Sequence, residues 1–250
     1  MAQLICKEIT IAYEKENVVS DFSMEVEKGD YISIIGENGT GKSSLLKGIL
    51  GIVPLRSGFV KFSDGVKRNN IGYLSQQSPM QKDFPASCYE VVLSGCLTRK
   101  GILPFFSKEE KQRAYTNMEK LGVLDLAKKS FADLSGGQRQ RILLARALCA
   151  TDKIIFLDEP ITGLDPIASK DFYSIIEKLN KEESITIIMI THDVDNALIY
   201  SNKVLHMHKY KYYFGNKADY LLHGGCTPDC MCEKPKKDVM CDRPKKGVLK

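Results

Sequence analysis

The chain has 250 residues, of which 43% are apolar and 27% charged, so it suits one large domain, or one domain with a small appendage, and excludes wholesale disorder. Its net charge is +5, and residues 226–250 hold seven Lys or Arg against four Asp or Glu, so the nearly neutral remainder excludes a body-wide nucleic-acid surface. Eight cysteines in a chain of this length do not indicate a disulfide scaffold. No apolar run approaches the roughly 18 residues of a membrane span, and Lys7 and Glu8 lie where a signal peptide would have its apolar stretch. A soluble protein of a reducing compartment is therefore expected.

The first predicted elements are two antiparallel strands, residues 4–13 and 18–26, joined by a charged loop at 14–17. From residue 31 onward, short β-branched runs alternate with longer segments of helical period, which predicts an α/β fold with a mostly parallel sheet flanked by helices. The clearest predicted strands are 31–35, 153–157 and 184–190, and the clearest helices are 42–50, 108–121, 137–149, 166–182 and 194–200.

Two further segments are set apart by composition. Residues 84–131 predict a helical block inserted between sheet-forming regions. Strand signals stop after about residue 214, and residues 217–222 predict one short helix. The polar tail contains a nine-residue repeat, 232–240 followed by 241–249, in which Cys, Pro, two Lys and Val recur. So polar a unit cannot bury a core, and a flexible tail is expected over 216–250.

A phosphate-binding loop is the first chemical motif. Residues 36–43 read G-x-x-x-x-G-K-S, directly after a predicted strand and directly before a helix. Glycines let successive N–H groups point at phosphate oxygens, and the helix N-terminus adds partial positive charge. Lys42 is expected to reach the β- and γ-phosphates and Ser43 to hold Mg²⁺. The alternative, a glycine-rich turn without a ligand, fits this context less well. The expected ATP-binding residues here are Gly36, Glu37, Asn38, Gly39, Thr40, Gly41, Lys42, Ser43 and Ser44.

An apolar strand at 153–157 ends in two adjacent acids, Asp158 and Glu159. Phosphate-loop folds place a strand-end Asp beside the loop to hold Mg²⁺, so Asp158 is expected to bind the metal. The Glu159 side chain points elsewhere and could polarise the attacking water. One acid for the metal and one for water is the arrangement of a hydrolase.

A third motif, residues 134–138 (Leu-Ser-Gly-Gly-Gln), begins another helix. Read alone it is a common helix start with Ser135 near the cap. Together with the loop and the two acids, in this order, it closely resembles the signature of the ATP-binding-cassette (ABC) ATPases, over about residues 3–215. The features that complete the resemblance are Tyr13, Gln76, Leu164-Asp165 and His192.

The resemblance implies a P-loop NTPase core with an N-terminal antiparallel β subdomain and an inserted helical subdomain. It also implies a homodimer in which each ATP lies between the Lys42 loop of one subunit and the signature of the other, formed by Leu134, Ser135, Gly136, Gly137 and Gln138. Tyr13 would stack on adenine, and Leu164 and Asp165 would cross the dimer interface. Gln76 would contact Mg²⁺ and water, and His192 would hold the γ-phosphate and the water activated by Glu159.

The segment 76–92 (Gln-Gln-Ser-Pro-Met-Gln-Lys-Asp-Phe-Pro, then Cys-Tyr-Glu-Val-Val after two residues) looks like the zinc, manganese or iron branch of importer ATPases. The resemblance implies an ATPase on the cytoplasmic face of the membrane, docked near residues 76–89 on a separate permease that receives metal from an extracytoplasmic binding protein. The alternatives are another cargo, such as an iron-siderophore, cobalamin or an exported solute, and a non-transport ABC ATPase.

The tail offers soft metal ligands: His223, Cys226, Cys230, Cys232 and Cys241. These favour Zn²⁺ or a related ion, for sensing or buffering, although the spacing lacks the paired C-x₂-C of a folded zinc module and solvated cysteines are the alternative. Cys6, Cys88, Cys96 and Cys149 are expected to be small core residues. His206 and His208 alternate on one face of a predicted strand and are interpreted as strand residues, with a ligand pair as the minor alternative.

Overall fold

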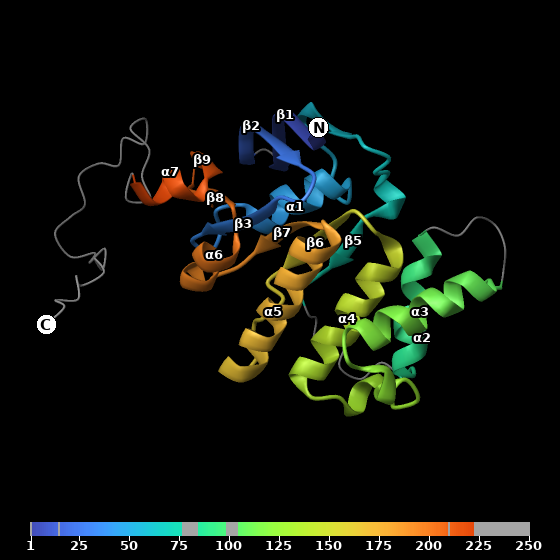
Figure 1. The fold of residues 1–250 in the computed structure, drawn as a ribbon. Helices are drawn as coiled ribbons and strands as arrows, with labels where there is room; N and C mark the ends of the chain where they lie inside the picture. The colour runs from blue at the N-terminus through green and yellow to red at the C-terminus, as the bar shows by residue number, and fades with distance from the viewer. Residues whose placement is uncertain (1, 15, 77–84, 99–104, 210, 223–250) are drawn as a thin grey trace, which may run out of the picture.

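A computed structural model of the chain describes residues 2–14, 16–76, 85–98, 105–209 and 211–222 (Figure 1). Two sheets organise these residues. The first is antiparallel with the order β2-β1-β4, and it consists of β1 (Ala2–Tyr13), β2 (Glu16–Glu27) and β4 (Ser57–Phe62). The second has the order β5-β6-β7-β3-β8-β9, in which only the β8–β9 pair is antiparallel. Its strands are β3 (Tyr31–Gly36), β5 (Gly72–Leu74), β6 (Ile154–Asp158), β7 (Thr186–Ile190), β8 (Lys203–Met207) and β9 (Tyr212–Asn216).

Helices cover both faces of the second sheet, so its central strands are buried throughout. Every residue of β6 and β7 is buried, which explains why they read as continuous apolar runs rather than as alternating patterns. Along β3, Ile32 and Ile34 join the core beneath the antiparallel sheet, whereas Tyr31 joins the core shared with the helical block. The helices are α1 (Lys42–Leu50), α2 (Cys88–Leu93), α3 (Lys108–Lys120), α4 (Gly136–Ala150), α5 (Pro166–Glu183), α6 (Val194–Tyr200) and α7 (Lys217–Leu222).

The predicted helical block is present as α2 and α3, which pack on α4 at the opposite side of the molecule from β1 and β2 (Figure 1). Serine residues define the starts of these helices. Ser87, Ser107 and Ser135 each accept a hydrogen bond from the backbone N–H three residues later. The Glu or Gln side chain of that later residue accepts a hydrogen bond from the serine backbone N–H. Such capping boxes stabilise a helix start by about 1 kcal/mol each and fix where the chain enters the helix.

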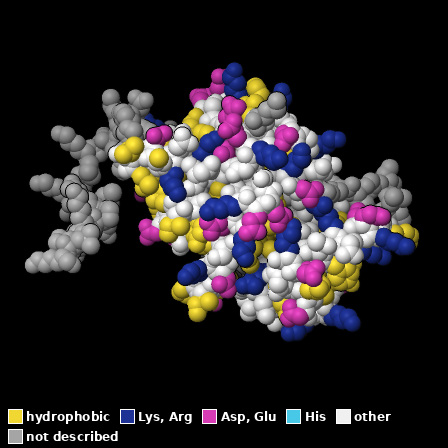
Figure 2. All heavy atoms as spheres, in the orientation of Figure 1, with side chains coloured by type: hydrophobic (Ala, Val, Ile, Leu, Met, Phe, Trp, Pro, Cys, Tyr) yellow, Lys and Arg dark blue, Asp and Glu magenta, His cyan; other side chains and the backbone are white. Residues whose placement is uncertain are grey.

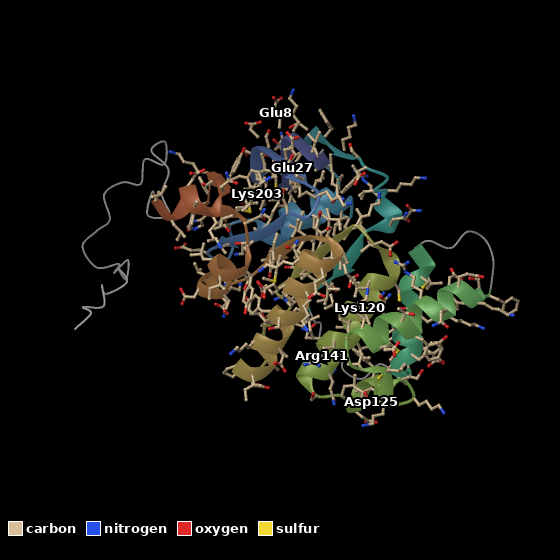
Figure 3. The ribbon with its side chains drawn as sticks, viewed as in Figure 1. Glu8, Glu27, Lys120, Asp125, Arg141 and Lys203 are labelled. Carbon is tan, nitrogen blue, oxygen red and sulfur yellow. The ribbon has the colours of Figure 1, made fainter. Side chains whose placement is uncertain are left out.

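Asp30 ties the turn between β2 and β3 to β8. Its carboxylate accepts hydrogen bonds from the backbone N–H of Glu27 (2.7 Å), from Asn202 (3.0 Å) and from Lys203 (2.8 Å). Asp30 and Lys203 are both largely buried, and Figure 3 labels Glu27 at the end of β2 and Lys203 at the start of β8. Because the carboxylate has several donors, its burial is compensated.

The surface in Figure 2 shows Lys and Arg interspersed with Asp and Glu, with no field of one sign over that face. Within the described ranges, no helix combines the length and the apolar character needed to traverse a bilayer.

Most of the predicted elements are confirmed, with ends that differ by one or two residues. The helices at 42–50, 194–200 and 217–222 coincide with α1, α6 and α7, and Cys6, Cys88, Cys96 and Cys149 are buried in the core, as expected. β4, β5 and β9 were not predicted. β5 has three residues, and β4 and β9 lie at sheet edges with much of their surface exposed, so each lacks a strong apolar pattern.

Candidate functional site

The candidate site lies at one edge of the second sheet, where parallel strands end together. β3 ends at Gly36 and leads into the phosphate-loop sequence, β6 ends at Asp158, and β7 is followed by Thr191 and His192. Because β3, β6 and β7 are adjacent and parallel, their carboxyl ends meet at the same edge. Residues far apart in the sequence thereby converge.

The loop between β3 and α1 requires glycine at two positions. A Cβ atom on Gly36 would lie 2.2 Å from the carbonyl oxygen of Met207, and Gly36 has a φ of 144°. Gly41, the N-cap residue of α1, has a φ of 94° and abuts Val18 of β2. Gly41 offers no side-chain cap, and the crest of the loop, residues 37–39, is exposed, so an anion can approach the first N–H groups of the helix.

Lys42 is folded back onto its own loop. Its Nζ donates hydrogen bonds to the carbonyl oxygens of Gly36 (2.8 Å) and Glu37 (2.7 Å). Burial lowers the pKa of Lys42, and the carboxylates of Glu159 and Asp158 partly oppose that shift. Both hydrogen-bond acceptors of this ammonium in the described residues are neutral carbonyls, so a phosphate would supply an anionic acceptor in their place.

Ser43 and Asp158 form an oxygen pair beside this lysine. The Ser43 hydroxyl donates to Asp158 Oδ1 over 3.2 Å. Burial raises the pKa of Asp158, and nearby Glu159 adds to the rise, whereas the Ser43 bond lowers it. Burial and the Asp158 carboxylate raise the pKa of the Tyr73 hydroxyl to about 12. Two oxygen ligands in cis positions on Mg²⁺ lie about 2.9 Å apart, so the hydroxyl and carboxylate oxygens fit the donor set and spacing that this ion prefers.

Glu159 is held between two side chains from different strands. Its Oε1 lies 2.6 Å from His192 Nε2, and its Oε2 accepts hydrogen bonds from Gln76 Nε2 (3.0 Å) and, more weakly, from Thr162 Oγ1 (3.4 Å). The backbone of Glu159 has a φ of 50°, in the left-handed region that a non-glycine residue rarely adopts. This backbone turns the carboxylate away from Asp158 toward Gln76 and His192, and such strain is concentrated at functional sites. No sequence motif indicated Thr162 or Tyr73 as neighbours of the two acids.

The other predicted nucleotide contacts are placed around this loop. Ser44 lies in the first turn of α1, and Thr40 is buried, with its hydroxyl donating to the carbonyl oxygen of Glu37 over 3.0 Å. Tyr13 ends β1 with 45% of its surface exposed, where an aromatic ring is open to a ligand. Val18, the third residue of β2, lies next to Gly41, so the β1–β2 hairpin approaches the phosphate loop.

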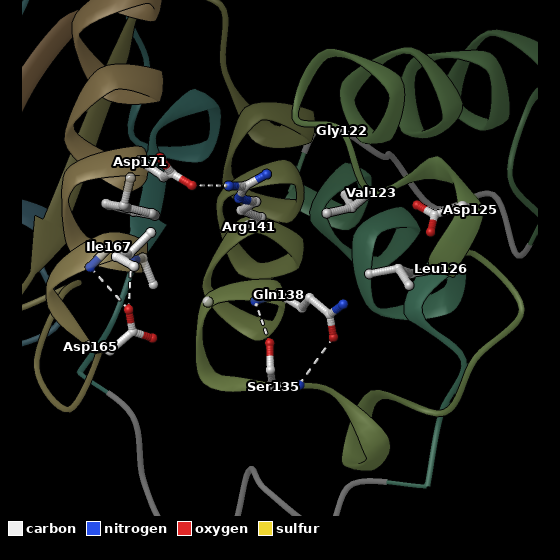
Figure 4. Close-up of a pocket in the computed structure, with 13 residues that line it drawn as sticks. Gly122, Val123, Asp125, Leu126, Ser135, Gln138, Arg141, Asp165, Ile167 and Asp171 are labelled. Atoms are coloured by element: carbon white, nitrogen blue, oxygen red, sulfur yellow. Dashed lines mark hydrogen bonds and ion pairs between the residues drawn. The ribbon is translucent and has the colours of Figure 1, made fainter.

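The signature residues form a separate site in this chain. Ser135 caps α4, and a cavity of about 380 Å³ lies between α4, α5 and residues 122–126 (Figure 4). Its lining includes Ser135, Gly137, Gln138 and Asp165, and none of the residues from the phosphate loop. The structure therefore brings together the predicted signature and the predicted dimer loop, but not the signature and Lys42 of one chain.

Close contacts join the signature to the loop before α5. A Cβ atom on Gly136 would lie 3.2 Å from Leu164 Cδ2, and one on Gly137 would lie 3.2 Å from Ala168 Cβ. Asp165 caps α5 by accepting hydrogen bonds from two backbone N–H groups. One turn further along, Arg141 of α4 forms an ion pair with Asp171 of α5 over 3.2 Å, an interaction that no sequence motif indicated.

A second, more apolar cavity of about 570 Å³ lies between α2 and α4. It is lined by Ala86, Glu90, Val91, Ser94, Phe131, Leu143 and Arg146. It borders the end of the segment 76–89 at which a permease was predicted to dock. Residues 77–84 of that segment, together with the predicted tail ligands His223, Cys226, Cys230, Cys232 and Cys241, lie outside the described residues.

The chain is similar to ATP-binding proteins of transport systems over most of its length. The family model described as "ABC transporter" matches residues 19–162. The manganese transport system ATP-binding protein MntB of Bacillus subtilis is 40% identical over 83% of this chain and 84% of its own length. The zinc uptake system ATP-binding protein ZurA of Listeria innocua is 34% identical over 85% of each chain. Among solved structures, cbiO1 of Clostridium perfringens, part of the ABC transporter complex cbiONQ, has a TM-score of 0.77 and 28% identity over 90% of this chain and 92% of its own.

Proposed function

Because the chain belongs to the ABC transporter family and is one of its ATPases, we propose that it energises the uptake of a divalent transition-metal ion through a separate membrane permease. The observation that carries the proposal is the agreement between two relatives that align with more than four-fifths of this chain: one is named for manganese transport and the other for zinc uptake. Alignments of this length include much more of the chain than the short motifs that every ABC ATPase needs.

We assign the nucleotide-binding roles to the residues at the edge of the second sheet. Residues 36–44 wrap the triphosphate, and Lys42 exchanges its two carbonyl partners for phosphate oxygens. Tyr13 stacks on adenine. Ser43, Asp158 and Gln76 hold Mg²⁺, which when bound offsets charge on the phosphate oxygens. The hydroxyl and carboxylate already lie close enough to share one ion.

We assign the hydrolytic role to Glu159. Its carboxylate accepts a proton from the attacking water, while Gln76 and His192 orient it from opposite sides. His192 also holds the γ-phosphate once the nucleotide is bound. In the absence of nucleotide, the short bond to His192 keeps the carboxylate in place, so little reorganisation is needed when the substrate arrives.

The signature completes the site from a second copy of the chain. Each copy holds its Lys42 loop and its Ser135–Gly137 helix start at separate places, so one ATP can meet both only when two copies pair head to tail. Residues 134–138 then contact the partner's triphosphate, and Leu164 and Asp165 cross the interface. The γ-phosphate bridges the two copies, and hydrolysis releases them.

The apolar cavity between α2 and α4 supplies the docking surface for a permease helix. It lies in the helical block, next to the segment that begins at Gln76, and Gln76 contacts Glu159. The chain therefore connects the proposed docking surface to Gln76, which contacts the proposed catalytic carboxylate. Such docking places the ATPase on the cytoplasmic face of the membrane, where the permease receives metal from an extracytoplasmic binding protein.

The tail residues His223, Cys226, Cys230, Cys232 and Cys241 supply the soft ligands of a Zn²⁺ site for sensing or buffering. This assignment rests on ligand type and on their placement within 19 residues of the sequence. Equilibrium dialysis with Zn²⁺ tests it: replacing the four tail cysteines with serine is expected to lower the amount of zinc bound per chain by one equivalent, and an unchanged stoichiometry would contradict it.

Reconstitution with the permease tests the transport proposal. ATPase activity of the complex in liposomes is measured with binding proteins loaded with Mn²⁺, Zn²⁺ or Fe²⁺, and with receptors for a siderophore and for cobalamin. Stimulation by a divalent-metal receptor is expected. Stimulation by only a non-metal receptor would assign another cargo, and hydrolysis that no receptor or permease alters would favour a non-transport ATPase.

A further inference from the structure

Two histidines lie side by side on the strand that follows the nucleotide site. His206 belongs to β8, as the sequence predicted, and His208 comes one residue after its end, where its backbone N–H donates to the carbonyl oxygen of Lys211 over 2.8 Å. The two ring centres are 4.1 Å apart and the ring planes are inclined by 39°. Both side chains are half-exposed, so solvent ions can reach them.

Tyr220 of α7 orients one of the two rings. Its hydroxyl oxygen lies 2.9 Å from Nδ1 of His206, and Tyr220 is itself 93% buried by its neighbours, with Tyr213 packed against its ring. When Nδ1 carries the proton and donates it to the tyrosine oxygen, the lone pair of His206 is on Nε2. A hydrogen bond at the second ring nitrogen is what fixes the tautomer of a metal-binding histidine.

The ring separation matches that of two imidazoles on one metal ion. With a metal–nitrogen distance of about 2.0 Å, ring centres lie about 4.5 Å apart for ligands at 90° and about 5.2 Å apart at the tetrahedral angle. The observed 4.1 Å is within a small side-chain rotation of the first value. The spacing is nearer to the value for ligands at 90°, the angle in square-planar and octahedral sites, than to the tetrahedral value.

We propose that His206 and His208 chelate one divalent transition-metal ion, with the order of affinity Cu²⁺, then Ni²⁺, then Zn²⁺. Among the residues that the structure describes, no group of three His, Cys, Asp or Glu side chains is arranged to hold a metal, so water completes the coordination sphere. Lys209 and Lys211 line the same small cavity as His208, and their positive charges moderate the affinity.

This site is distinct from the ATP site but adjoins it. Met207, between the two histidines, pairs with Gly36, and its carbonyl oxygen is the atom that forbids a side chain there. His208 and Thr40 of the phosphate loop line one cavity of about 110 Å³. A metal bound to both rings would therefore cross-link the end of β8, where Met207 contacts Gly36 of the phosphate loop.

The test is a titration of the full chain with Cu²⁺ in the absence of nucleotide. The stoichiometry and affinity come from the titration, and the ligand nitrogens come from electron paramagnetic resonance. Because free thiols reduce Cu²⁺, the parent protein carries serine at the four tail cysteines and asparagine at His223, which also removes the tail ligands. One equivalent of Cu²⁺ with two imidazole nitrogens is expected. H206Q and H208Q should each weaken binding at least about tenfold, since a chelate becomes a single ligand. Tyr220→Phe should weaken it about tenfold through loss of the orienting bond.

His192→Gln is the matched control and should leave Cu²⁺ binding unchanged. Thermal unfolding without metal verifies that each variant is folded. In the parent protein, Zn²⁺ should shift the imidazole NMR signals of His206 and His208 and leave that of His192 in place, a readout that needs no substitution at the site. The proposal would be overturned if the folded H206Q/H208Q double variant bound Cu²⁺ with unchanged affinity. It would also be overturned if the NMR signals of both rings did not shift when Zn²⁺ is added.

Discussion

The Nε2 atom of His192 lies 2.6 Å from Oε1 of Glu159, and this contact joins the second residue after β7 to the first residue after β6. Gln76 holds the other oxygen of the same carboxylate at 3.0 Å. Glu159 therefore has a fixed position before any nucleotide arrives. The two neighbours define separable tests, because one substitution removes the proposed base and another removes only a group that orients it.

Glu159→Gln is expected to slow ATP hydrolysis by about 10²–10⁴-fold, since an amide cannot accept the proton from water. ATP binding should be kept, because the phosphate loop is untouched, and ATP-bound dimers should accumulate. Steady-state phosphate release and gel filtration with Mg·ATP measure the two effects. Glu182→Gln, on the exposed side of α5, is the matched control. Wild-type turnover in Glu159→Gln would remove Glu159 from the role of base.

His192→Ala should lower kcat by about 10²-fold while nucleotide affinity changes little, because the imidazole orients the base and holds the γ-phosphate rather than binding adenine. His192→Gln keeps a donor near the Glu159 carboxylate and should recover part of the loss. Nucleotide affinity from a fluorescent ATP analogue separates binding from turnover. Equal kcat in wild type and His192→Ala would contradict the assignment.

The sequence could predict that the proposed ATP-site residues lie together, because several of them lie at or just beyond the end of a strand whose apolar run is easily seen. Gly36, Asp158 and His192 could be expected at one edge once three parallel strands were predicted, because parallel strands end together. The left-handed backbone of Glu159 could not be predicted, since no residue type there demands it. Its contact with Gln76 depends on β5, a three-residue strand that is too short for a periodic pattern.

The hydrogen-bond network around Asp30 also could not be predicted from the sequence. Asp30 appears as a polar residue in a turn, and its partners at Asn202 and Lys203 lie more than 170 residues away. Local patterns carry no information on such a pairing. The capping boxes are a different case, because S-x-x-E at Ser87 and Ser107 and S-x-x-Q at Ser135 are visible in the sequence and mark helix starts within a residue.

Asp158→Asn should stabilise the nucleotide-free protein while it impairs Mg²⁺-dependent hydrolysis. Burial raises the pKa of this carboxyl, so the folded state disfavours its charged form. The resulting penalty is absent at low pH, where the carboxyl is protonated in both states, and is complete above the folded-state pKa. At pH 7.5 we expect the Tm to rise by about 2–4 °C. Calorimetry at pH 7.5 measures it, and a lower Tm in Asp158→Asn would show that the charge is stabilised by its surroundings.

Asp30→Ala should destabilise the fold without altering the catalytic groups. The substitution leaves the largely buried Lys203 ammonium without its carboxylate and removes three hydrogen bonds. We expect a loss of about 3 kcal/mol in the free energy of unfolding, measured by urea denaturation. Asp171→Ala, which removes the more exposed ion pair with Arg141, should cost less than about 1 kcal/mol. Equal losses in the two variants would mean that burial does not strengthen the Asp30 network.

The head-to-tail arrangement predicts which pairs of damaged chains can associate. All chains carry Glu159→Gln so that bound ATP persists. Lys42→Ala removes the phosphate grip, and Ser135→Arg places a bulky side chain at the helix start that should face the partner's ATP. Neither variant should dimerise alone. A mixture should form ATP-dependent heterodimers, detected by energy transfer between two labels, because the intact loop of one chain meets the intact signature of the other. The chain that carries both substitutions, mixed with Lys42→Ala, has no complete site and should stay monomeric. If that mixture paired as well as the complementary one, ATP would not be shared between copies in the proposed way.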